Sequence, residues 1–126
     1  MDNRKIILVV DDSSANLQLC RGLLSGDFDV RLAKSGTLAL DALAKLRPDV
    51  ILLDIEMPDM SGFEVMTEIN MRPELENVPV IFVTSHATEK LVVKAVQHGV
   101  VDYLVKPFEA ELLRSKIQAA LKPKGK

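Results

Sequence analysis

The sequence predicts an α/β fold in which a doubly wound, five-stranded parallel sheet carries helices on both faces. Short apolar runs and amphipathic segments alternate five times along the 126 residues, which is the pattern of consecutive strand–helix units. Three of the runs consist almost entirely of Val, Ile and Leu, as is typical of strands that are buried on both faces. For units of this length we expect the strand order 2-1-3-4-5.

Each predicted strand is a short apolar run. The first, third and fourth runs are almost continuously apolar, whereas the second alternates with polar residues and therefore indicates an edge strand. The expected strands are Lys5–Val10, Asp29–Ala33, Val50–Leu53, Val80–Thr84 and Asp102–Val105.

The segments after the strands carry apolar residues at helical spacing. Serine precedes three of these segments, so Ser13 or Ser14, Ser35 and Ser61 are candidate N-caps, and Gly99 is expected to end the fourth helix. The residues expected to face the core are Leu17, Cys20 and Leu24 in the first helix, Ala39, Ala42, Leu43 and Leu46 in the second, Gly62, Val65, Met66 and Ile69 in the third, Val92, Ala95 and Val96 in the fourth, and Leu113, Ile117, Ala120 and Leu121 in the fifth.

Composition and charge exclude several classes of protein. Lys and Arg number 16 against 18 Asp and Glu, and the formal net charge of −2 gives no electrostatic basis for direct nucleic-acid binding. The N-terminal apolar run is short and is stopped by two aspartates, so we expect neither a signal peptide nor a membrane span. We therefore expect a cytoplasmic location. Cys20 has no partner for an internal disulfide and is expected to be a buried thiol.

The chain is expected to form one domain over residues 1–122, followed by a short basic tail or linker stub at 123–126. The sequence leaves open whether this domain acts alone or belongs to a longer protein.

Polar and charged residues stand where the predicted strands end. Asp11 and Asp12 follow the first strand and Asp54 follows the third. Thr84 closes the fourth strand and Lys106 follows the fifth. Because doubly wound sheets place their site at the carboxyl ends of the strands, we expect these side chains to converge on one edge.

This set of residues favours phosphoryl chemistry. Clustered carboxylates need a counter-charge, and Mg²⁺ prefers oxygen ligands while keeping several waters. Asp54, one carboxylate of the Asp11/Asp12 pair and a backbone carbonyl shortly after Asp54 would suffice as ligands. A carboxylate nucleophile beside Mg²⁺, the Lys106 ammonium and the Thr84 hydroxyl can accept a phosphoryl group.

Each residue also has a simpler structural interpretation. Asp11 and Asp12 could end a strand and cap the following helix, and Lys106 alone could be a solvated loop residue. Asp54 is harder to explain in this way, because a charge at the end of a buried strand is costly unless it is paired or used. The agreement of four separate segments favours a site.

Four segments together resemble the receiver domain of two-component response regulators, the CheY-like superfamily, over nearly the whole chain. They are ILVVDDSSANL, PDVILLDIEMPDMSGFEV, VPVIFVTSHA and GVVDYLVKPFEAELL. The resemblance implies a flavodoxin-like (βα)5 fold and a signalling domain rather than an enzyme. It also implies that a sensor histidine kinase or a histidine phosphotransfer protein is the phosphohistidine donor, and that a downstream protein or a missing output domain receives the signal.

The resemblance further implies roles for individual residues. Asp54 would be the phosphoacceptor, with slow self-dephosphorylation, and Thr84 and Lys106 would contact phosphoryl oxygens. Thr84 and Tyr103 would form the switch that alters a surface made by helix four, strand five and helix five. The expected Mg²⁺ ligands are Asp11, Asp12, Asp54 and the backbone carbonyl of Glu56; the expected rate-tuning positions are Glu56 and His86; the expected cis peptide joins Lys106 and Pro107.

Two other function classes fit parts of the pattern. An aspartate-nucleophile phosphatase of the haloacid-dehalogenase type needs a second Asp two residues beyond its nucleophile, and here that position is Glu56. A nucleotide or flavin binder of the doubly wound type needs glycines in the first strand–helix turn. This turn reads DDSSAN, which places two carboxylates where an anion would have to bind.

Overall fold

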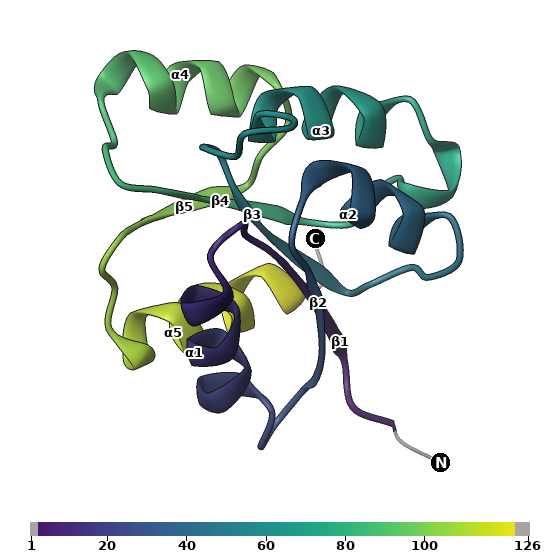
Figure 1. Cartoon of the computed structure of the whole chain (residues 1–126), viewed down its shortest axis with the longest axis vertical. Helices are drawn as coiled ribbons and strands as arrows, with labels where there is room; N and C mark the ends of the chain where they lie inside the picture. The colour runs from purple at the N-terminus through teal and green to yellow at the C-terminus, as the bar shows by residue number, and fades with distance from the viewer. Residues whose placement is uncertain (1–2, 123–126) are drawn as a thin grey trace.

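A computed structural model describes residues 3–122 as a five-stranded parallel sheet between two layers of helices (Figure 1). The strand order is β2-β1-β3-β4-β5, so the predicted order is confirmed. The strands are β1 (Ile6–Val10), β2 (Asp29–Ala33), β3 (Val50–Asp54), β4 (Val80–Thr84) and β5 (Asp102–Val105). The helices are α1 (Ser14–Leu24), α2 (Gly36–Leu43), α3 (Gly62–Asn70), α4 (Glu89–Gln97) and α5 (Ala110–Leu121). The expected tail at 123–126 lies outside the described residues.

The two faces of the sheet bury separate apolar clusters, because successive side chains of a strand point to opposite faces. In β1, Leu8 and Val10 belong to the cluster under α2, α3 and α4, whereas Ile7 and Val9 belong to the cluster under α1 and α5. Figure 1 shows the same division, with α2, α3 and α4 on one face and α1 and α5 on the other. This burial on both faces explains the almost continuous apolar runs.

Side-chain caps fix where four of the helices begin, with Thr88 capping α4 by accepting a bond from the Leu91 N–H. Ser13, Ser35 and Ser61 each accept a hydrogen bond from a backbone N–H in the first turn of α1, α2 and α3. At α3, Glu64 also returns a bond to the Ser61 N–H, which completes a capping box. Gly99, just beyond α4, has a φ of +92°, a conformation that favours glycine.

The sequence prediction is wrong for one face of α4. Val96 was expected to face the core, but its side chain is 65% exposed, while Ala95 is buried. Leu91, one turn before Ala95, packs against the core instead. The physical reason is that only a narrow stripe of this helix touches the sheet, so an apolar residue next to the stripe faces solvent.

Smaller differences concern the ends of elements. β1 begins at Ile6 rather than at Lys5, and β3 extends to include Asp54. Leu46 lies beyond the end of α2. A short 3₁₀ helix, Pro73–Leu75, was not predicted and forms where Pro73 occupies the first helical position. Within residues 3–122, no helix has the length and apolar character needed to cross a membrane.

Gly62 is predicted to be required for the close approach of α3 to the end of β3. A Cβ atom at Gly62 would lie 2.9 Å from the backbone oxygen of Asp54 and 2.9 Å from the Cα of Ile55. Gly62→Ala should therefore lower the free energy of unfolding by about 1–3 kcal/mol, measured by urea denaturation.

The control is Gly22→Ala, because nothing lies within 4 Å of a Cβ atom at this position inside α1. This variant should be more stable than the wild type by about 0.5–1 kcal/mol, since glycine disfavours a helix interior. Equal effects of the two substitutions would contradict the packing argument.

Candidate functional site

Residues from three separate strand ends meet at the carboxyl edge of the sheet. Asp11 follows β1 and Asp54 ends β3; their exposed fractions are only 5% and 2%. Lys106, directly after β5, extends between them, with its Nζ 3.2 Å from Asp11 Oδ2 and 3.3 Å from Asp54 Oδ2. One ammonium group therefore faces two buried carboxylates. This is the convergence expected from the fold.

Asp12 completes a group of three carboxylates. One oxygen from each of Asp11, Asp12 and Asp54 can be chosen so that all three lie within 4.8 Å of one another. Asp12 is exposed, whereas the other two are buried, so the group opens to solvent on one side. An all-oxygen donor set with an open side fits a hydrated hard cation such as Mg²⁺.

Burial and like charge disfavour the ionised form of Asp54. Burial contributes most, and the neighbouring Asp11 carboxylate adds to it, so that the pKa of Asp54 rises to about 6 despite the opposing effect of Lys106. For Lys106, burial opposes the charged form, but Asp54 and Asp11 outweigh it and raise the pKa of the ammonium. Lys106 is therefore a permanent cation, while Asp54 holds its proton more tightly than an exposed aspartate.

Local hydrogen bonds orient both buried carboxylates. Asp11 Oδ1 accepts a bond of 2.9 Å from the Ser13 N–H, and Asp11 Oδ2 accepts one of 3.3 Å from the Asn16 amide. The turn into α1 thus uses Asp11 locally as well, as the simpler interpretation suggested. Asp54 Oδ1 accepts a bond of 3.2 Å from the Glu56 N–H. The oxygens Asp11 Oδ2 and Asp54 Oδ2 face Lys106.

Thr84, fully buried at the end of β4, is bonded to Glu56 and His86. Its hydroxyl lies 2.9 Å from Glu56 Oε2, 3.2 Å from the His86 carbonyl oxygen and 3.1 Å from the His86 backbone nitrogen. The side chains of Glu56 and His86 are exposed. The sequence-based roles of these two residues as rate-tuning positions stay predictions.

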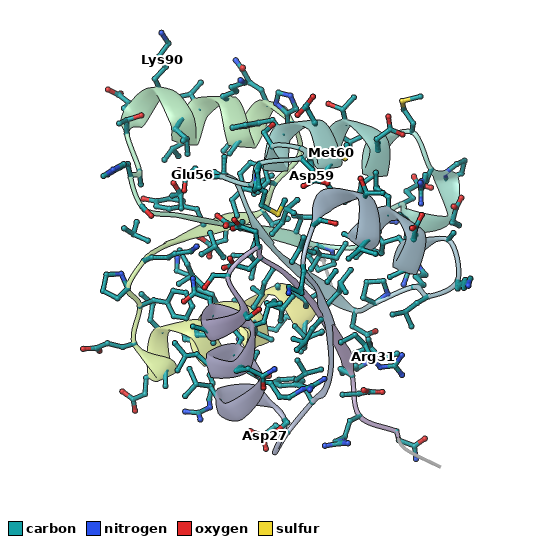
Figure 2. All side chains as sticks on the ribbon, in the orientation of Figure 1. Asp27, Arg31, Glu56, Asp59, Met60 and Lys90 are labelled. Carbon is teal, nitrogen blue, oxygen red and sulfur yellow. The ribbon has the colours of Figure 1, made fainter. Side chains whose placement is uncertain are left out.

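The loop from β3 to α3 is bound to the start of α2; Figure 2 labels Glu56, Asp59 and Met60 along this loop. The Asp59 carboxylate accepts bonds from the backbone N–H groups of Gly36 and Thr37 at the start of α2, and from the Thr37 hydroxyl. These bonds, that from the Thr37 N–H first, lower the pKa of Asp59. Met60 lies so close to Gly36 that a Cβ atom there would be 2.8 Å from Met60 Cβ. The loop carrying Glu56 is therefore fixed against α2.

Tyr103 lies half-buried in β5. Its backbone N–H donates to Asp102 Oδ1 at 2.8 Å, and Lys116 of α5 donates to the same oxygen at 2.8 Å. The Lys116 ammonium lies 5.6 Å from the centre of the Tyr103 ring. The ring thus contacts α5 through a cation and faces α4 across a hollow of about 150 Å³.

Two further expectations concern single residues near the site. The peptide bond between Lys106 and Pro107 is cis, as the resemblance implied. Cys20 is buried beneath the site, and burial, followed by the negative charge of Asp11, raises the pKa of its thiol to about 11. The thiol is therefore held in its neutral form, as expected of a core residue.

Two contacts of the site were not found by sequence reasoning. These are the bond from Thr84 to Glu56 and the bonds from α2 to Asp59. The sequence did contain an indication of the first contact. An acidic residue two positions after β3 and a hydroxyl at the end of the neighbouring β4 are both expected at the same edge of the sheet. The sequence contained no indication of the second, since it joins the start of α2 to a loop residue that lies 22 positions later in the chain.

The comparisons with known proteins agree on one family. The family model described as "Response regulator receiver domain" matches residues 7–118. Chemotaxis protein CheY4 of Vibrio cholerae has a similar structure, with a TM-score of 0.90 and 31% identity, over 94% of this chain and 99% of that one.

Two curated relatives are much longer proteins. A probable cyclic di-GMP phosphodiesterase of Vibrio cholerae is 39% identical over 118 residues, which are 94% of this chain and 27% of the relative. The hybrid signal transduction histidine kinase D of Dictyostelium discoideum is 34% identical over 115 residues, which are 91% of this chain and 7% of the relative. The chain thus spans about a quarter or less of the length of these relatives.

The raised pKa of Asp54 predicts how stability depends on pH when no divalent cation is bound. Between the unfolded value of 3.8 and the folded value of about 6, the folded chain binds more protons than the unfolded chain. The stability contributed by protonated Asp54 is therefore present at low pH and is lost as the pH rises toward about 6.

Asp54→Asn removes this ionisation. In EDTA at about pH 8 the variant should be more stable than the wild type by roughly 1–3 kcal/mol, and the difference should shrink toward about pH 4. Urea denaturation across this range measures it, with Asp27→Asn, a change at an exposed loop position, as the control. A difference that does not vary with pH would contradict the assignment.

Proposed function

The chain belongs to the response regulator receiver family, and on this premise we propose that it accepts a phosphoryl group on Asp54 from a phosphohistidine donor and signals by changing a protein-binding surface. One observation carries the proposal. Asp54 is buried at the carboxyl edge of the sheet, with Lys106 at 3.3 Å and two further carboxylates close enough to share a cation. The family match leaves the phosphatase and nucleotide-binding alternatives without support.

Phosphoryl transfer would use the side chains already in place. A deprotonated oxygen of Asp54 attacks phosphorus in line, the P–N bond of the phosphohistidine breaks, and the imidazole leaves with the bonding electrons. The Lys106 ammonium neutralises charge on a transferring oxygen, and the Thr84 hydroxyl donates to another. Above about pH 6 Asp54 is mostly ionised, so the nucleophile is available at neutral pH.

The carboxylates of Asp11, Asp12 and Asp54, with the backbone carbonyl of Glu56, would hold Mg²⁺. When bound, this ion would offset the repulsion among the carboxylates and the transferring oxygens. Later hydrolysis of the acyl phosphate, by attack of water at phosphorus, returns Asp54 to its free form. Glu56 and His86 are the residues that we propose adjust the rate; the Glu56 N–H bonds Asp54, and both residues bond Thr84.

The proposed output surface is formed by α4, β5 and α5. Four valines or leucines on these elements are notably exposed for their size: Val93 and Val96 of α4 at 50% and 65%, Val105 of β5 at 39% and Leu112 of α5 at 47%. Apolar exposure on three adjacent elements favours protein contact. A phosphoryl group that draws the Thr84 hydroxyl toward Asp54 would leave room for Tyr103 to move and would alter this surface.

The partners follow from the same chemistry. A histidine kinase or a histidine phosphotransfer protein would be the donor, and the receiver-like segment of a hybrid histidine kinase among the relatives supports a place in such signalling. The recipient of the signal would be a separate protein or an output domain. We propose that residues 1–122 form the receiver unit in either case.

Acetyl phosphate tests the proposed acceptor directly. With Mg²⁺, the wild type is expected to gain the mass of one phosphoryl group, and hydroxylamine should remove it because the product is an acyl phosphate. Asp54→Asn should gain none, since the amide is not a nucleophile at this position. Intact-protein mass spectrometry measures both.

The matched control is Asp27→Asn, which removes a carboxylate from the exposed loop between α1 and β2 and should be labelled like the wild type. Equal labelling of Asp54→Asn and the wild type would refute the assignment of the acceptor.

A further inference from the structure

The carboxylate of Glu56 contacts two hydrogen-bond donors at the end of β4. Its Oε2 accepts a bond of 2.9 Å from the Thr84 hydroxyl, and its Oε1 lies 3.5 Å from the backbone nitrogen of Ser85. Thr84 is fully buried, so its hydroxyl depends on partners supplied by the protein. Glu56 is exposed overall, but its two carboxylate oxygens lie against these donors.

The Thr84 hydroxyl has one proton and two acceptors within reach. The Glu56 carboxylate is at 2.9 Å and the His86 carbonyl oxygen is at 3.2 Å, while the His86 N–H occupies the acceptor side of the hydroxyl at 3.1 Å. A bond to an ionised acceptor is the stronger of the two. The proton is therefore directed toward Glu56 in this state.

Glu56 also lies beside the proposed acceptor. Its backbone N–H donates to Asp54 Oδ1 at 3.2 Å, so the same residue bonds Asp54 through its main chain and Thr84 through its side chain. β3 and β4 are neighbours in the sheet, with Asp54 paired to Val83, the residue before Thr84. A group attached to Asp54 and the Glu56 carboxylate would thus compete for the same hydroxyl.

We propose that Glu56 is a positioning residue, whose carboxylate acts as an internal anion bound to Thr84 and Ser85. A phosphoryl group on Asp54 must then displace this carboxylate to engage the Thr84 hydroxyl. This inference rests on the proposed function. It goes beyond a rate-tuning role, because Glu56 would act on the switch through Thr84 and would need no contact with the attacking water. The exchange breaks one hydrogen bond of the hydroxyl and makes another, without a covalent step.

The free energy of this exchange depends on two opposing interactions of the Glu56 carboxylate. The arriving group carries roughly −1.5 to −2 charges, which repel the Glu56 carboxylate and favour its release. Against this, the bond from Thr84 stabilises the unphosphorylated arrangement. Removing the Glu56 carboxylate should therefore make the phosphorylated arrangement easier to reach, and should change the environment of Thr84 even before any phosphoryl group is present.

The first measurement uses NMR on the full chain without Mg²⁺ or phosphoryl donor. In Glu56→Ala, the signals of Thr84, Ser85 and Tyr103 should shift toward their positions in the wild type bound to beryllofluoride and Mg²⁺. Glu56→Gln keeps a side-chain acceptor and should shift them less. Glu74→Ala removes a carboxylate from the exposed 3₁₀ helix and should leave them unchanged. Equal shifts in Glu56→Gln and Glu56→Ala would contradict the inference.

The second measurement is a double-mutant cycle on the affinity for beryllofluoride at saturating Mg²⁺. Glu56→Ala should bind about threefold to tenfold more tightly than the wild type, as expected when one competing hydrogen bond is lost. In a Thr84→Val background the same substitution should have little effect, because the competed hydroxyl is gone. An equal gain in both backgrounds would mean that Glu56 acts by charge alone and would overturn the inference.

The outcomes separate this inference from the proposed function. A wild type that does not bind beryllofluoride with Mg²⁺ would overturn the proposed function and, with it, the role of Glu56. A wild type that binds would overturn the inference alone if Glu56→Ala gave the same NMR signals as Glu74→Ala and bound beryllofluoride no more tightly than the wild type.

Discussion

The structure depends on how one edge of the sheet accommodates three neighbouring carboxylates. Asp11 and Asp54 are buried there with Asp12 beside them, and Lys106 is the cation that contacts both buried groups. A single ammonium does not balance three negative charges, and burial, followed by the repulsion of Asp11, raises the pKa of Asp54 in spite of Lys106. A divalent cation would restore the balance. A cation bound at this edge would also stabilise the ionised form of Asp54, which is the form that can accept a phosphoryl group.

The fold fixes the relative positions of the groups at this edge through strand pairing and close packing. β1, β3 and β4 are adjacent and parallel, so their carboxyl ends deliver Asp11, Asp54 and Thr84 side by side. The loop after β3 is fixed by the close approach of Gly62 to the backbone of Asp54 and by the bonds from α2 to Asp59. Glu56 lies in the chain between Asp54, whose backbone packs against Gly62, and Asp59, which is bonded to α2. Its contact with Thr84 therefore reflects a loop that is held in place on both sides.

Sequence patterns were sufficient for the strand order, the two apolar faces and the convergence of the strand-end residues, because these follow from periodicity and from the geometry of parallel sheets. They were not sufficient for the Glu56–Thr84 bond or for the cap that Asp59 provides to α2, since both depend on the path of a loop. Val96 was misplaced because the spacing of apolar residues does not show how narrow the buried stripe of α4 is. The roles of the site residues stay predictions.

The central claim is that the carboxylates of Asp11, Asp12 and Asp54 form a site for a divalent cation. Isothermal titration of Mg²⁺ into the wild type and into Asp12→Asn tests it most directly, because Asp12 is exposed and its replacement leaves the core intact. The account predicts that the wild type binds one Mg²⁺ and that Asp12→Asn binds it at least about tenfold more weakly, as loss of a metal ligand implies. Equal Mg²⁺ affinity in the two proteins, or no binding by the wild type, would contradict it.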